Sequence, residues 1–120
     1  MDLNIGIPTT QAKADSWEVL MPLLRAMYNE LKELSKKKPE GVVGKAKIAI
    51  VNRLLHKCRE VLADEESIAF LDVLNDDDMP QASDVVLMLS QYVAAMEQFQ
   101  ERHQGWDHTW NIGPARRRER

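Results

Sequence analysis

The chain has 120 residues, a formal net charge of −3 and a single cysteine, and 44% of its residues are hydrophobic. This length suits one domain that buries its own core, and one cysteine excludes an internal disulfide and favours a reducing setting. The sequence shows neither a secretory leader nor a run of about 20 apolar residues, so we expect a soluble cytoplasmic protein without a membrane segment.

The first predicted element is a helix over residues 15–35. Apolar residues recur every three or four positions from Trp17 onward, and Val19 and Leu23 widen this stripe, which predicts a central helix. Pro22 lies on the polar side of the pattern, so we expect it to bend the helix without breaking it. A lysine-rich last turn followed by proline and glycine predicts the end of the helix.

A second helix is predicted over residues 44–63. Its apolar stripe runs from Ile48 to Leu62 and is flanked by Ile50, while charged and polar residues occupy the other half of the circumference. Cys58 lies within the stripe, and free cysteine is among the most buried residue types. We therefore expect its thiol to be inaccessible to reagents in the folded protein.

A short helix and a long last helix follow. Residues 64–67 are expected to cap the short helix, and Phe70 is one of its apolar residues. An acidic turn comes next, and the spacing of Asp78 and Gln81 predicts a capping box that opens the last helix. Gly105 predicts the end of that helix, with a left-handed cap and an apolar contact from the following tryptophan.

These elements predict an all-α fold, a compact bundle of three long helices plus one short helix. The bundle is expected over residues 15–105, with an extended N-terminal arm over residues 1–14 and an Arg-rich C-terminal tail over residues 106–120. We find no internal repeat and no second domain.

The net charge of −3 conceals two opposed blocks that follow each other in the chain. Residues 32–59 hold nine Lys or Arg against Glu33 and Glu40, which gives +7, whereas residues 60–84 hold nine Asp or Glu and no base, which gives −9. Such blocks affect association more than they affect the fold. The sequence leaves open whether the two blocks neutralise each other within one bundle or between copies.

Catalytic and metal-binding patterns are poorly represented. Cys58 and His56 point to opposite sides of their helix and cannot act as nucleophile and base. His103, Asp107 and His108 match no common zinc spacing. We expect no catalytic residue, no cofactor and no bound metal, and hence a protein that is not an enzyme.

One enzymatic alternative rests on paired carboxylates. All-helical nucleotide pyrophosphohydrolases hold magnesium on Glu-x-x-Glu and Glu-x-x-Asp motifs, and Glu30 with Glu33 matches the first of these motifs. No Glu-x-x-Asp follows anywhere in the chain. A magnesium-dependent nucleotide hydrolase is therefore the least favoured of the hypotheses.

The leading hypothesis concerns the outer face of the last helix. This face is small and uncharged, whereas a helix face in contact with water usually carries Lys, Glu or Arg. Its residues are Leu87, Ser90, Gln91, Ala94 and Gln98. We expect a non-catalytic interaction protein that self-associates or docks on another protein through this face, unless the apolar residues of the arm and tail cover it.

The second hypothesis is nucleic-acid binding by the polar half of the second helix. Basic side chains there could follow a phosphate backbone, although no aromatic residue is interleaved to stack on bases. The candidate residues are Lys45, Asn52, Arg53, His56, Lys57 and Arg59.

Overall fold

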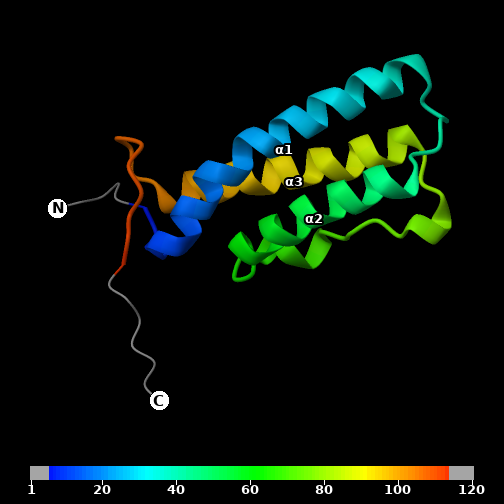
Figure 1. Ribbon diagram of the computed structural model, residues 1–120. Helices are drawn as coiled ribbons and strands as arrows, with labels where there is room; N and C mark the ends of the chain where they lie inside the picture. The colour runs from blue at the N-terminus through cyan, green and yellow to red at the C-terminus, as the bar shows by residue number, and fades with distance from the viewer. Residues whose placement is uncertain (1–5, 114–120) are drawn as a thin grey trace.

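The computed structural model describes residues 6–113 of the chain. Over these residues the fold is all-α, as predicted, and its long helices lie alongside one another (Figure 1). The three long helices are α1 (Gln11–Lys37), α2 (Lys45–Val61) and α3 (Ala82–His103), and two short 3₁₀ helices, η1 (Glu66–Phe70) and η2 (Asp76–Asp78), lie between α2 and α3 in the chain.

Helix α1 begins four residues before the predicted start because Thr10 caps it. The backbone N–H of Lys13 donates to Thr10 Oγ1 at 3.1 Å, which satisfies one of the free amides of the first turn. The helix continues through Pro22, whose side chain is exposed, so the proline does not break it. Residues 11–14, which the sequence analysis assigned to the arm, are therefore helical.

Helix α2 agrees with its prediction to within two residues at each end. Gly44 is its N-cap, and Cys58 is fully buried within the apolar stripe, as expected. The short element that follows differs from the prediction, because η1 is a five-residue 3₁₀ helix and Phe70 is 78% exposed. Leu71 and Leu74, in the extended segment beyond η1, are buried instead.

The predicted capping box of α3 was displaced by three residues. Asp78 belongs to η2, and the box is formed by Gln81 and Asp84, with Gln81 N–H donating to Asp84 Oδ2 at 3.1 Å. Both pairs have the same spacing, but the left-handed conformation of Met79 separates Asp78 from the helix. Helix α3 therefore begins at Ala82.

The predicted left-handed cap at Gly105 was wrong. Helix α3 ends at His103, and the capping residue Gln104 is extended. Gly105 then opens a turn in which its N–H donates to the carbonyl of Thr109 at 2.9 Å. Trp106 is exposed and does not make the expected apolar contact with the helix.

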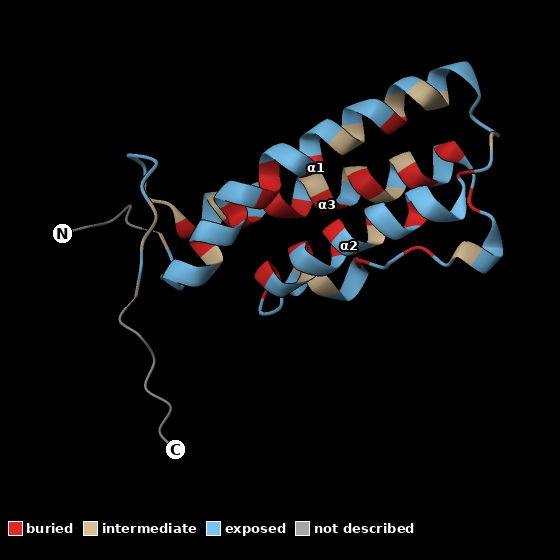
Figure 2. Ribbon diagram, in the orientation of Figure 1, coloured by how far each residue is buried: buried red, intermediate tan, exposed pale blue. Residues whose placement is uncertain are grey.

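The core lies where α1 packs against both α2 and α3. Figure 2 shows the buried residues on the facing sides of the helices. The largest fully buried side chains of the core include Met21 and Leu24 of α1, Leu55 of α2, and Tyr92 and Phe99 of α3. None of the helices within residues 6–113 is long and apolar enough to cross a membrane.

The described parts of the arm and tail pair with each other at one end of the bundle. Thr9 N–H donates to the carbonyl of Asn111 at 2.9 Å, and Gly113 N–H donates to the carbonyl of Thr9 at 3.0 Å. Trp110 contacts Trp17 of α1 edge-on, with ring centroids 5.3 Å apart. Leu3, Ile5 and the Arg-rich end of the tail lie outside the described residues.

Candidate interaction surfaces

The outer face of α3 is accessible in the structure. Leu87 is 62% exposed, and the described parts of the arm and tail pack at the far end of α3 instead of over it. Ser90 is half-buried, and its hydroxyl donates to the carbonyl of Leu87 at 2.7 Å. This half of the predicted face therefore presents one large apolar side chain to solvent.

The second half of the same face lies beside η1. Gln91, Ala94 and Gln98 line a recess of about 530 Å³ together with Ser67 and Phe70. Phe70, one of the apolar residues of the predicted short helix, is thus exposed at the edge of the predicted interface.

The predicted basic face of α2 divides into two groups. Asn52 donates from Nδ2 to the carbonyl of Leu74 at 2.8 Å and accepts the N–H of the same residue at 2.9 Å. The guanidinium of Arg59 donates to the carbonyl of Leu71. These two side chains hold the extended segment beyond η1, whereas the other four candidates, Lys45, Arg53, His56 and Lys57, are exposed.

The basic block (residues 32–59) and the acidic block (residues 60–84) form few ion pairs with each other. Within residues 6–113 the one ion pair that joins them is Lys57 with Glu60, at 3.9 Å. Asp64 of the acidic block pairs instead with Lys13 at 2.7 Å, and this hydrogen bond and the lysine charge lower the Asp64 pKa. The basic block is therefore largely available to a partner.

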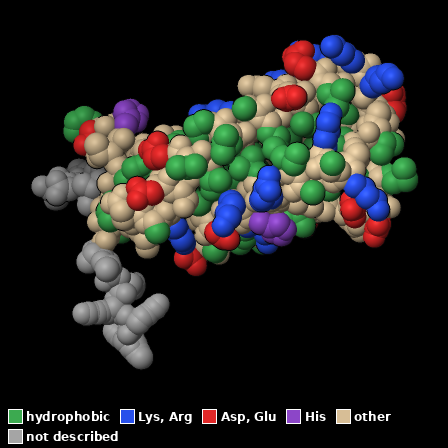
Figure 3. Space-filling view, viewed as in Figure 1, with side chains coloured by type: hydrophobic (Ala, Val, Ile, Leu, Met, Phe, Trp, Pro, Cys, Tyr) green, Lys and Arg blue, Asp and Glu red, His purple; other side chains and the backbone are tan. Residues whose placement is uncertain are grey.

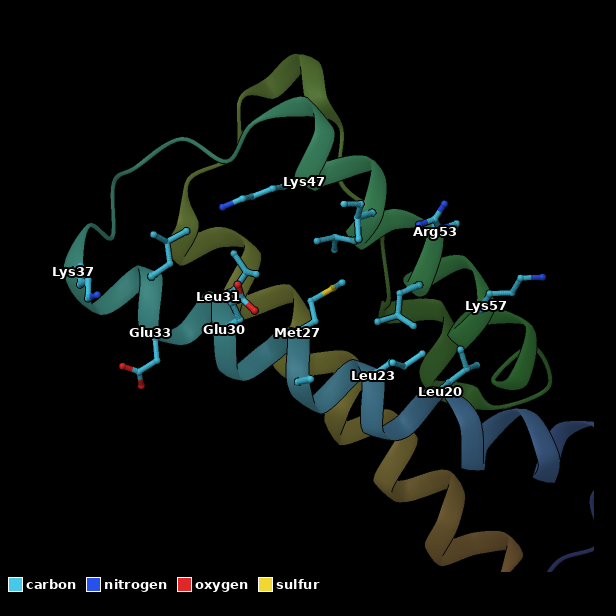
Figure 4. Close-up of a pocket in the computed structure, with 15 residues that line it drawn as sticks. Leu20, Leu23, Met27, Glu30, Leu31, Glu33, Lys37, Lys47, Arg53 and Lys57 are labelled. Carbon is cyan, nitrogen blue, oxygen red and sulfur yellow. The ribbon is translucent and has the colours of Figure 1, made fainter.

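An open groove of about 900 Å³ runs between α1 and α2. Figure 4 shows side chains from both helices converging on it, and Figure 3 shows hydrophobic side chains exposed along the same band. The apolar lining includes Leu20, Leu23, Met27 and Leu31 of α1 and Ile50 and Leu54 of α2. Leu23 is 54% exposed and Ile50 is 50% exposed, so the bundle itself leaves much of this apolar surface in water.

Charged side chains border the groove unequally. The α2 side contributes Lys47, Arg53 and Lys57 and no acidic residue. The α1 side contributes Glu30, Glu33 and Lys37, and Glu33 is already paired with Lys36 at 3.1 Å. The edge formed by Lys47, Arg53 and Lys57, which we call the basic edge, is therefore the strongest electrostatic feature of the groove.

Sequence reasoning missed this groove. It assigned Leu23 and Ile50 to widened core stripes, because an apolar residue beside a stripe looks the same whether or not a neighbouring helix covers it. The available signal was the width of the two stripes. Three helices do not provide enough neighbours to cover both stripes fully.

A buried polar cluster closes the end of the bundle where the arm and tail meet. His103 Nε2 lies 2.9 Å from Glu65 Oε2, and His103 Nδ1 lies 2.8 Å from the carbonyl oxygen of Ile7. A carbonyl oxygen only accepts hydrogen bonds, so Nδ1 donates to Ile7. The hydrogen bond between Nε2 and Glu65 then requires a proton on one of those two groups. Arg102 pairs with the other oxygen of Glu65 at 3.1 Å.

This cluster and the cysteine have structural roles in the bundle. Asp107 and His108 are exposed and distinct from the buried His103, and residues 6–113 contain no group of three or more His, Cys, Asp or Glu placed to hold a metal ion. Burial raises the pKa of the Cys58 thiol to about 12, so it is not activated as a nucleophile. His56 is exposed on the opposite side of α2.

No protein-family model, curated protein or solved structure matches this chain.

Proposed function

We propose that the chain is a non-catalytic helical interaction protein that docks on a protein partner. The observation that carries this proposal is the open apolar groove between α1 and α2, in which Leu23 and Ile50 are half exposed. Contiguous apolar surface of this kind is a common mark of a protein interaction site, and a groove between helices is a common receptor for a partner segment.

The outer face of α3 is a second candidate surface for docking or self-association. Leu87 and Phe70 are exposed near the uncharged residues predicted from the sequence. A copy of the chain that docked there would bury both apolar side chains. Light scattering on a sizing column tests this, because Leu87→Glu should dissociate any oligomer formed through that face.

Partner docking is tested by retention from a native lysate with matched variants. Leu23→Glu combined with Ile50→Glu places two negative charges in the groove, and Trp106→Glu places one on an exposed residue at the far end of the molecule. A partner retained by the wild type and by Trp106→Glu, but lost from the groove variant, supports the proposal. Identical proteins retained by all variants, including Leu87→Glu, would count against it.

Nucleic-acid binding remains the alternative, because Lys45, Arg53, His56 and Lys57 are exposed and the basic block has few internal partners. Retardation of single or double strands should then depend strongly on salt. Replacing Arg53 and Lys57 by Ala should reduce the slope of log K against log salt by about 2. Absence of binding at low salt would end this alternative.

A magnesium-dependent nucleotide hydrolase has the least support. Glu30 and Glu33 border the groove beside Lys37, and Glu33 is paired with Lys36. The described residues bring no further carboxylate to these two to complete a magnesium site.

A further inference from the structure

We infer that the groove between α1 and α2 accepts an amphipathic helix whose flank facing α2 carries Asp or Glu. This inference rests on the proposed docking function and adds the chemistry of the partner. Three observations carry it: the length of the groove, the apolar side chains left exposed along it, and the sign of its basic edge.

The length of the groove suits a helix of three to four turns. Its lining extends along α1 from Leu20 to Lys37 and along α2 from Lys47 to Lys57. At 1.5 Å per residue these stretches measure about 25 Å and about 15 Å. A docked helix of that length would present apolar anchors at i, i+3 or i+4, and i+7 to the groove.

The exposed apolar residues favour a helix over a small ligand. Leu23 and Ile50 lie on opposite walls, and Val19, one turn before Leu23, continues the apolar row beyond the end of the groove and is also exposed. A compact ligand seated between the walls would leave Val19 in water. A helix lying along α1 would cover the whole row. It would pack against the side of α1 that the bundle leaves exposed.

Charge decides which helix fits. Lys47, Arg53 and Lys57 form one edge of the groove, on which Lys57 has a long contact with Glu60 at 3.9 Å, so a docked helix with carboxylates on that flank would gain up to three favourable pairs. The Arg-rich end of this chain has the same sign as the basic edge and would be repelled. In a second copy the acidic block at residues 60–84 contains η1, η2 and only the ends of α2 and α3, so this block supplies no long helix.

Two synthetic peptides test the inference directly. Both are fluorescein-labelled 16-residue helices with the same row of Leu and Ala, and one carries Glu along a flank where the other carries Lys. Fluorescence anisotropy should show the Glu peptide binding about tenfold more tightly, as expected for three exposed pairs, with the difference shrinking at high salt. Lys47→Glu combined with Arg53→Glu should reverse the preference.

Control variants separate this inference from the docking function beneath it. Leu87→Glu should bind the Glu peptide as the wild type does, and Ile50→Glu should lose it, with circular dichroism confirming that each variant is folded. Equal binding of the Glu and Lys peptides overturns the acidic partner and leaves groove docking intact. Undiminished binding to Ile50→Glu overturns groove docking itself.

Other occupants are distinguishable outcomes. A dimer of the wild type that Ile50→Glu dissociates in light scattering would assign the groove to a second copy. An apolar small molecule that copurifies with the wild type, but not with Ile50→Glu, would assign it to a ligand of that class. Either result, or failure of both peptides to bind, overturns the inference.

Discussion

Ionisation of Cys58 should destabilise the protein at alkaline pH. Burial raises the pKa of this thiol from 9.0 to about 12 in the folded chain. Between these values the unfolded chain has lost the thiol proton and the folded chain retains it, so the free energy of unfolding falls as pH rises. The slope is about 1.4 kcal/mol per pH unit, which gives a loss of about 1.4 kcal/mol between pH 8 and pH 10.

Urea unfolding of the wild type and of Cys58→Ala at the two pH values isolates this contribution. Lysine and tyrosine side chains titrate in both proteins and cancel in the comparison. The difference in free energy of unfolding between the two proteins should shift by about 1.4 kcal/mol in favour of the variant at pH 10. Below pH 8 the difference should not depend on pH.

Two results would refute this reasoning. One is an identical pH dependence for both proteins, which would mean that the Cys58 thiol ionises as readily in the folded chain as in the unfolded one. The other is rapid labelling of Cys58 by a thiol reagent at pH 8 under native conditions, which would show that the thiol is not enclosed by the core.

The remaining predictions concern polar contacts outside the groove. Glu65→Ala should cost about 1 to 3 kcal/mol in urea unfolding because it leaves His103 Nε2 buried without a hydrogen-bond partner, whereas Glu65→Gln still hydrogen-bonds the ring and should cost less. Equal losses would contradict this view of the pair. Asn52→Ala should cost about 1 to 3 kcal/mol and expose the segment beyond η1 to proteases. Lys13→Ala should return the Asp64 pKa towards its ordinary value in an NMR titration. Because the Asp64 carboxyl is exposed, this pair should contribute less than about 1 kcal/mol, present above the ordinary Asp pKa and lost as pH falls.

Periodicity was sufficient to predict the three long helices and the burial of Cys58, because each stripe repeats over several turns. The ends of the helices were less predictable. Asp78 with Gln81 and Gln81 with Asp84 have the same spacing, and only the backbone at Met79 decides which pair caps α3. Gly105 is a common helix terminator, yet the chain leaves the helix at Gln104 in an extended conformation.

The candidate surfaces were predictable only in part. The outer face of α3 follows from its lack of charge, and the structure leaves Leu87 exposed there. Asn52 and Arg59 were grouped with solvent-facing bases because their backbone partners lie 22 and 12 residues away, in a segment without periodicity. Leu23 and Ile50 could not be distinguished from core residues, since their exposure depends on how many helices surround them.

The pairing of arm and tail also has a consequence for the order of folding. The contact of Ile7 with His103 joins residues 96 apart, and that of Gly6 with Asn111 joins residues 105 apart, so both need residues far apart in the sequence to be available together. Closing a loop of that length loses more chain entropy than forming the local contacts within a helix. We therefore expect this end of the bundle to assemble last during synthesis and its amides to exchange with solvent before those of the core.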